Sequence, residues 1–261
     1  MTDHKAMFQA PAEVYDRFVG RYSSALARGM CTAAEIRPGQ RALDVGCGSG
    51  ALLEVLAAIV GEDNAVGVDP SEPFVEAARA KVPGARVVVG SAEALPFGDG
   101  EFDAALAQLV INFLDDPRAG VVEMARVTRP GGVVAACVWD YSGGMTLLRT
   151  FWESALAVDP EGAKARMEHQ MPFARPEELE ELWQTSLTDV AVSPIDIEAS
   201  YEDFDDLWTP FLGGVGPAGA YAVSLDPEPQ SRLADEFARR LGSPEGPFTL
   251  SARAWCAVGS A

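Results

Sequence analysis

The stretch that decides the fold is ALDVGCGSGALLEVLAA, residues 42–58. Strand-like residues lead into three glycines within five positions, and a helix-like run follows them. Such a turn lets a ligand approach the backbone closely, while free N–H groups of the helix point towards it. The letters from Gly46 to Ala51 satisfy the loose dinucleotide fingerprint, in which alanine replaces the third glycine. A nicotinamide cofactor is therefore one candidate ligand.

Around this turn, residues 41–140 alternate β-rich runs with amphipathic helices, a pattern typical of a parallel sheet covered on both faces. A first helix should close at Gly61, a second should begin after Ser71, and a third should start at Asp115 or Asp116 and end before Pro130. The predicted strands are 41–45, 65–68, 86–89, 102–109 and 133–139.

The regular alternation stops after Tyr141. Helices are predicted at 146–158, 176–184 and 230–241, and strands at 188–198 and 248–258. Forty-nine residues (199–247) separate these last two strands, more than an ordinary connection, which indicates a cap over the ligand. We therefore expect an N-terminal helical segment (1–40), a cofactor-binding core (41–199), a helical cap (200–246) and a final core strand (247–261).

Charge and cysteine usage narrow the choice of partners. The chain carries 20 Lys and Arg against 39 Asp and Glu, a formal net charge of −19. This charge repels phosphate backbones and anionic membrane surfaces, so we expect a small-molecule partner, no nucleic acid and no membrane. The four cysteines are widely spaced with no histidine nearby, which predicts buried thiols and no metal site. No apolar signal core opens the chain, so we interpret the protein as cytoplasmic.

Two carboxylates bear on the identity of the ligand. Asp69 ends the second predicted strand, about 20 residues beyond the glycines, where an acid can accept both ribose hydroxyls of an adenosine group. The alternative is that it caps the following helix. Asp44 lies two residues before the first glycine, where it would repel a pyrophosphate and favour a cationic amine or sulfonium. Its alternative role is to organise the loop through backbone amides.

Four segments carry a resemblance to a known family: LDVGCGSG (43–50), VGVDPS (66–71), GSAEALPFGDGEFDAALAQ (90–108) and RVTRPGGVVAACVWD (126–140). In order and spacing the chain resembles the class I S-adenosylmethionine-dependent methyltransferases. It is most similar to the small-molecule branch that includes the ubiquinone and menaquinone biosynthesis enzymes. The resemblance implies an α/β fold, a Rossmann-like three-layer sandwich. Its mostly parallel seven-stranded sheet would have an antiparallel last strand, with a mainly helical cap inserted before that strand.

The same resemblance implies S-adenosyl-L-methionine as cofactor, held at the ends of the first four strands and by the opening helix. Asp44 would lie near its amino group, Asp69 would hold the ribose hydroxyls, and Gln108 would lie near the sulfonium. The family often has an acid where Ser91 stands here. The implied cofactor-binding residues are Tyr15, Arg21, Asp44, Gly46, Cys47, Gly48, Asp69, Pro70, Ser71, Ser91, Ala92, Glu93, Gln108 and Leu109. A solvated amphipathic helix is the alternative explanation for Tyr15 and Arg21.

The implied reaction is direct displacement at the methyl carbon, in which the protein aligns the reactants and needs no nucleophilic side chain. His169 is a weak candidate for a general base, against the alternative of a surface or core-edge histidine. Trp139 and Tyr141 leave the C-terminal end of a central strand, so we expect them in the acceptor pocket. Simple aromatic packing is the alternative.

Two other functions stay open from the sequence. An NAD(P)-dependent oxidoreductase of the short-chain type needs a Tyr-x-x-x-Lys pair, and no tyrosine of this chain is followed by lysine at that spacing. Asp44 weighs against the other dinucleotide-binding oxidoreductases. A non-catalytic protein that only binds S-adenosylmethionine would leave the same motifs.

Overall fold

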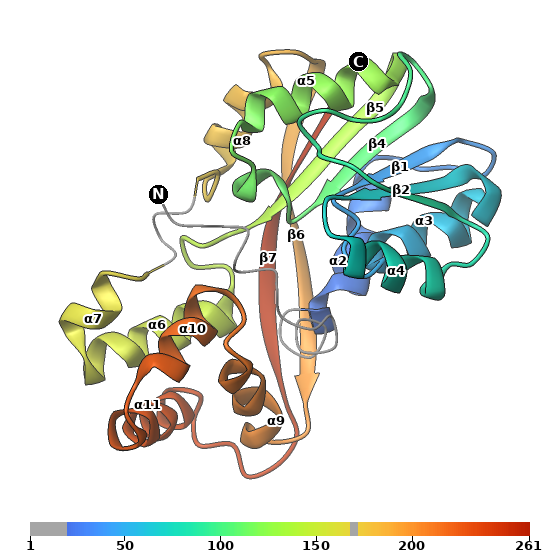
Figure 1. Ribbon diagram of the computed structural model, residues 1–261. Coiled ribbons are helices and arrows are strands. Elements are labelled where there is room, and N and C mark those ends of the chain that lie inside the picture. Colours follow the sequence, from blue (N-terminus) through green and yellow to red (C-terminus); the bar gives the residue numbers. More distant parts are fainter. Residues whose placement is uncertain (1–19, 168–171) are drawn as a thin grey trace. The chain divides into compact units, whose positions relative to one another are not determined.

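The computed structural model describes residues 20–167 and 172–261, and its sheet has seven strands in the order β3-β2-β1-β4-β5-β7-β6 (Figure 1). Strands β1 to β5 pair in parallel, and β7 runs antiparallel to β5. The predicted Rossmann-like sheet with an antiparallel last strand is thereby confirmed. The strands are β1 (Ala42–Val45), β2 (Ala65–Asp69), β3 (Arg86–Val89), β4 (Phe102–Gln108), β5 (Thr128–Trp139), β6 (Thr188–Tyr201) and β7 (Phe248–Ser260).

The helices begin and end close to the local sequence signals. Gly61 ends the helix after the glycine turn with a φ of 90°, and Asp116 caps a later helix by accepting the Ala119 N–H at 3.0 Å. The helices are α2 (Gly20–Ala33), α3 (Ala51–Val60), α4 (Glu72–Lys81), α5 (Pro117–Val127), α6 (Thr146–Val158), α7 (Pro160–Lys164), α8 (Pro176–Trp183), α9 (Phe204–Trp208), α10 (Gly216–Ser224) and α11 (Pro227–Arg240), with short 3-10 helices η2 (Glu62–Asn64), η3 (Ile111–Phe113) and η5 (Thr209–Gly213). None of these described helices has the length and apolar character needed to cross a bilayer.

The start of β5 differs from the prediction. The strand begins at Thr128, before the expected residue 133, and α5 ends at Val127. Phe102 of β4 pairs with Thr128 across a register shift, so the strand continues through the Pro-Gly-Gly sequence that local signals mark as a turn. Long-range pairing therefore overrides the turn signal here.

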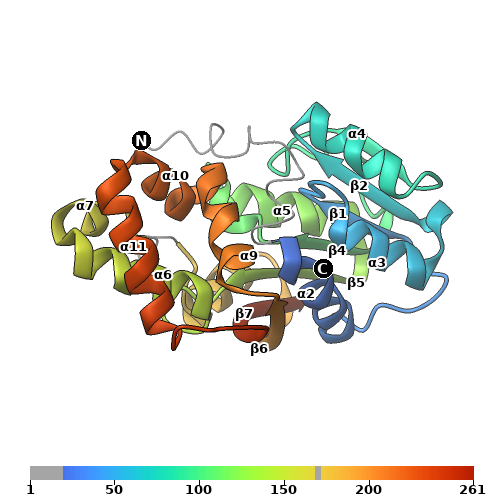
Figure 2. The same cartoon turned by 90° about the horizontal axis from the view of Figure 1, so that it is seen from below.

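The handedness of the connections sets the layers. From β1 to β2 and on to β3 the chain steps one way along the sheet, and from β4 to β5 it steps the other way. Right-handed crossovers then put α3 and α4 on one face and α5 on the other. Helix α8 contacts β5, because Trp183 donates its ring N–H to the Val134 carbonyl at 3.2 Å. Helix α2 lies beside α3 (Figure 2). The direction reverses between β1 and β4, the place where open α/β sheets bind ligands.

The chain divides into two compact units. The larger unit is Ser23–Trp139, Pro172–Ile195 and Ala254–Ala261, and the described residues of the smaller unit are 20–22, 140–167 and 196–253. The smaller unit has its own aromatic core, in which Phe151 stacks on Phe211 with ring centroids 4.6 Å apart and meets Phe237 edge-on at 5.9 Å. Helix α6, which carries Phe151, belongs to the same unit as α9 to α11. The predicted cofactor-binding core (41–199) includes this helix. Our boundaries at residues 40, 199 and 246 stay a prediction.

Candidate functional site

The glycine turn forms a backbone loop between β1 and α3. Gly46, Gly48 and Gly50 have φ angles of 70°, 50° and 88°, in the left-handed region that side chains disfavour. The N–H groups of Gly46 and Cys47 both donate to the Val68 carbonyl, at 2.7 and 3.0 Å, which ties the loop to β2. No described atom lies within 4 Å of the place where a Cβ on Gly48 would stand. The loop is therefore firmly held and open at its middle.

Asp69, at the end of β2, orders this loop. The residue is 7% exposed, and its two carboxylate oxygens accept the backbone N–H groups of Gly48 and Ser71, each at 2.9 Å. Ser71 is the N-cap residue of α4, but its own side chain makes no capping bond. Burial raises the pKa of Asp69, while the Ser71 and Gly48 amides lower it. Each carboxylate oxygen has a second lone pair, so the group can still accept a ligand hydroxyl.

Asp44, inside β1, is a buried carboxylate that the protein does not satisfy. The residue is 1% exposed, and neither carboxylate oxygen has a hydrogen-bond partner among the described residues. Burial, and then the charge of Asp69, hold its pKa well above the ordinary range. The Leu53 N–H in the first turn of α3 lowers the pKa, yet it lies outside ordinary hydrogen-bond geometry. A cationic ligand group would offset this cost, so the site fits an ammonium better than a phosphate.

The end of β4 borders the loop. Val110 lies so close to Gly46 that a Cβ there would stand 2.5 Å from the Val110 Cγ2 atom. Gln108 donates its amide N–H to the Ser23 carbonyl of α2 at 3.2 Å, while its Oε1 atom is buried without a partner among the described residues. Leu109 has a φ of 59°, strained for a non-glycine residue. Strands β1 and β4 thus bring the predicted residues of both segments together.

The turn after β3 uses its polar side chains within the protein. The Ser91 hydroxyl accepts the Glu93 N–H at 3.2 Å, and the Glu93 carboxylate accepts the Asp116 N–H at 2.6 Å. Ala92 between them is buried. A role for this turn, or for Pro70 and Ser71, along the adenine stays a prediction.

Arg21 belongs to the smaller unit, and acidic and aromatic groups of that unit hold it. Its guanidinium donates to both oxygens of Asp206, at 2.8 and 2.7 Å, and to the Ser200 carbonyl at 2.7 Å. The same group lies 4.4 Å from the ring centroid of Tyr201. A cofactor carboxylate would therefore compete with Asp206 for Arg21, whose cofactor role stays a prediction.

The structure does not test the roles predicted for the four remaining site residues. Tyr15 and His169 lie outside the described residues. Trp139 is buried at the end of β5, and Tyr141 follows it by two residues in the smaller unit. Their assignment to an acceptor pocket stays a prediction.

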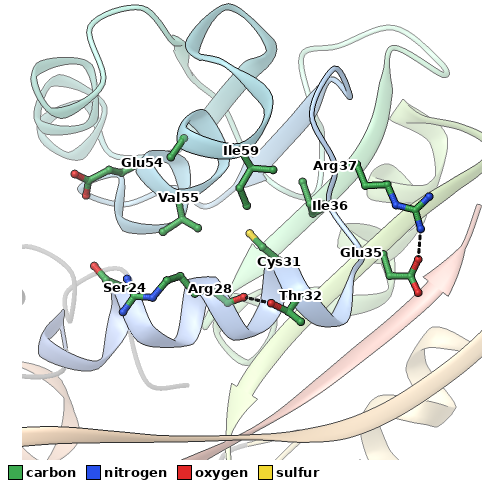
Figure 3. A pocket seen from close by; sticks show the side chains of 11 residues that line it. Ser24, Arg28, Cys31, Thr32, Glu35, Ile36, Arg37, Glu54, Val55 and Ile59 are labelled. Atoms are coloured by element: carbon green, nitrogen blue, oxygen red, sulfur yellow. Dashed lines mark hydrogen bonds and ion pairs between the residues drawn. The ribbon is translucent and has the colours of Figure 1, made fainter.

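A cavity of about 910 Å³ lies between α2 and α3 (Figure 3). Cys31, Val55 and Ile59 line it, and its polar groups are Arg28, Arg37, Glu35 and Glu54 with Ser24 and Thr32. Arg37 pairs with Glu35 at 2.6 Å. Two cations and two anions give the cavity no preference for a charged ligand, and none of the cofactor candidates lines it.

Comparison with known proteins identifies relatives. Residues 43–136 match the family described as "Methyltransferase domain". A demethylmenaquinone methyltransferase of Roseiflexus castenholzii is 35% identical over 193 residues, which cover 67% of this chain and 81% of that protein. An uncharacterized 37.1 kDa protein in transposon TN4556 of Streptomyces fradiae is 38% identical over 117 residues, which cover 42% of this chain. The chain spans only 34% of that second relative.

A solved structure shares the fold at low identity. It is a phosphoethanolamine N-methyltransferase 2 of Haemonchus contortus in complex with phosphomonomethylethanolamine and S-adenosylhomocysteine. The match has a TM-score of 0.55 and 16% identity, and it covers 90% of this chain and 52% of that one.

Proposed function

Because this chain belongs to the class I S-adenosylmethionine-dependent methyltransferases, we propose that it transfers a methyl group from S-adenosylmethionine to a small-molecule acceptor. The observation that carries the proposal is the state of Asp44, which is buried and has no hydrogen-bond partner among the described residues. It lies in β1, next to β4, where the order of the strands reverses. A carboxylate in that state destabilises the protein unless a cation lies beside it. The cofactor has an ammonium and a sulfonium, whereas a dinucleotide brings a pyrophosphate.

The chain's own residues bind and orient. Asp44 would accept the cofactor ammonium, and Asp69 would accept the ribose hydroxyls with the lone pairs left free by Gly48 and Ser71. When bound, S-adenosylmethionine supplies an electrophilic methyl carbon, so the protein needs no nucleophile of its own. The rigid loop and the buried end of β4 would hold the reactants in line and exclude water.

A named relative and the charge of the chain support the proposed substrate class. The Roseiflexus castenholzii relative is named a demethylmenaquinone methyltransferase, and the chain's net charge of −19 disfavours nucleic acids. We therefore propose an uncharged or cationic small molecule as acceptor, with 1,4-dihydroxynaphthalene as the first compound to test.

Calorimetry with S-adenosylmethionine, S-adenosylhomocysteine and NADH tests the cofactor. We expect both adenosyl compounds to bind and NADH to be silent; the reverse result would overturn the proposal. Methyl-labelled cofactor incubated with 1,4-dihydroxynaphthalene, catechols, amines and a metabolite extract then tests turnover by mass spectrometry. Binding without any labelled product would favour the non-catalytic alternative.

A further inference from the structure

Asn112, in η3, is another buried polar side chain whose polar atoms have no partner among the described residues. It is 3% exposed, and neither its Oδ1 nor its Nδ2 atom has a hydrogen-bond partner among the described residues. A buried amide with both ends unpaired destabilises the folded state, so its presence indicates an external partner. The sequence motifs did not single out this residue, because an isolated asparagine carries no pattern.

The surroundings of Asn112 belong to the candidate site. Gln108, four residues earlier, also has a buried oxygen without a described partner. Between them lie Leu109, with its strained φ of 59°, and Val110, which packs against Gly46 of the glycine loop. Backbone strain of this kind is retained mainly where a functional site requires it. One strained turn beside the loop thus holds three unpaired polar atoms, Gln108 Oε1 and both amide atoms of Asn112.

The chemistry of the side chain points to the kind of partner. A carboxylate such as Asp44 favours a cation. A neutral side-chain amide has one hydrogen-bond donor group and one acceptor group, so it suits an uncharged hydroxyl or amide. We propose that Asn112 hydrogen-bonds such a group on the methyl acceptor and thereby contributes to acceptor specificity. This inference rests on the proposed function, since it assigns Asn112 to the acceptor side of the same site.

The sequence offers a direct probe, because Asn64 and Asn112 are its only asparagines. Protein labelled with ¹⁵N-asparagine should show two side-chain amide groups by NMR. Asn64 is the internal reference: its amide donates to the Val60 carbonyl at 2.9 Å, next to the amino end of β2. The protein is first saturated with S-adenosylhomocysteine and then titrated with 1,4-dihydroxynaphthalene.

We expect the Asn112 amide signals to move with the naphthalene diol while those of Asn64 stay in place. Movement with S-adenosylhomocysteine alone would make Asn112 a cofactor residue, and no movement with either would leave it a packing residue; both results overturn the inference. Absence of S-adenosylhomocysteine binding by calorimetry, in contrast, would be a failure of the proposed function itself.

Asn112→Leu separates ligand binding from folding, with Asn64→Leu as the matched control. Leucine has a similar size and needs no hydrogen bond, so the variant should be at least as stable as the parent. Its affinity for S-adenosylhomocysteine should stay within about twofold, while KM for the diol should rise about tenfold, the usual effect of one lost hydrogen bond. A clear loss of thermal stability with unchanged KM would contradict the inference and assign the amide a structural partner.

Discussion

The carboxylate of Asp69 accepts the backbone N–H of Gly48 at 2.9 Å, so the acid that ends β2 holds the loop that follows β1. The two residues lie 21 positions apart, and the contact joins the predicted ribose-binding group to the predicted methionine-binding loop. Substitution of Asp69 should therefore have two effects: it should weaken binding of a ligand hydroxyl, and it should disturb the shape of the loop.

Asp69→Ala should weaken S-adenosylhomocysteine binding about tenfold or more, because charge-assisted hydrogen bonds to the ribose are lost. It should also lower the free energy of unfolding by about 1 to 3 kcal/mol, since two backbone amides lose their acceptor. Calorimetry and urea unfolding measure the two effects. Asp63→Asn, at an exposed acid of η2, is the control. Unchanged affinity in the Asp69 variant would remove it from the site.

Asp44 should make stability and binding respond to pH in opposite directions. Its folded-state pKa is raised well above its unfolded value of about 3.9, mainly by burial. Wild type and Asp44→Asn should therefore be equally stable below that unfolded value. As pH rises through the folded-state pKa, wild type should become less stable than the variant, by about 1 to 3 kcal/mol.

Ligand affinity should depend on pH in the opposite sense to stability. An ammonium beside Asp44 favours its charged form, so S-adenosylhomocysteine should bind wild type with release of a proton and more tightly as pH rises. Asp44→Asn should bind more weakly and lose that pH dependence. Urea unfolding and calorimetry in buffers of different ionisation enthalpy test both statements. A variant that unfolds more easily than wild type at pH 8 would contradict the assignment of Asp44 as an unsatisfied group.

Gly46 and Gly48 should respond differently to alanine. Gly46→Ala brings a Cβ 2.5 Å from Val110 Cγ2 at a left-handed φ, so we expect a loss of stability of about 2 kcal/mol or more. Gly48→Ala meets no described atom within 4 Å, and its left-handed φ alone should cost about 1 kcal/mol. Its methyl group should nevertheless weaken S-adenosylhomocysteine binding about tenfold by occupying ligand space. Val110→Ala should partly rescue Gly46→Ala; equal behaviour of the two glycine variants would contradict this account.

Arg21 and Asp206 should act as one unit in stability. The two side chains are 21% and 31% exposed and pair at 2.7 Å, so a double-mutant cycle with alanine should give a coupling energy of about 1 kcal/mol. Hydrogen bonding by Arg21 lowers the pKa of Asp206, so the pair stabilises the fold above the ordinary carboxyl pKa and stops doing so as pH falls through the folded-state value. Additive effects of the two substitutions would refute the coupling.

The same pair tests the cofactor role predicted for Arg21. If Arg21 binds the cofactor carboxylate, Arg21→Ala should weaken S-adenosylhomocysteine binding while Asp206→Ala should not, because removing Asp206 frees the guanidinium. Equal affinities in both variants would assign Arg21 to the structure of the smaller unit alone. Calorimetry at pH 7.5 on both variants gives the answer.

Much of the fold could be predicted from the sequence, because the signals that specify it are local or periodic. Alternating strands and helices, Gly61 at the end of α3 and Asp116 at the start of α5 all depend on residues within a few positions of one another. The mostly parallel seven-stranded sheet with an antiparallel last strand followed from a family resemblance and was confirmed. The start of β5 was wrongly predicted because its pairing with β4 involves a distant strand.

The sequence by itself determined the glycine turn and the acids beside it, because short-range spacing encodes backbone shape and charge. Only the tertiary structure decided which polar groups are left without partners. Burial of Asp44 and Asn112, the hold of Asp69 on Gly48 and the placement of α6 through Phe151 all arise from residues that meet across the fold. A hydrogen bond missing in a buried site depends on every neighbour in space, and no local pattern records it.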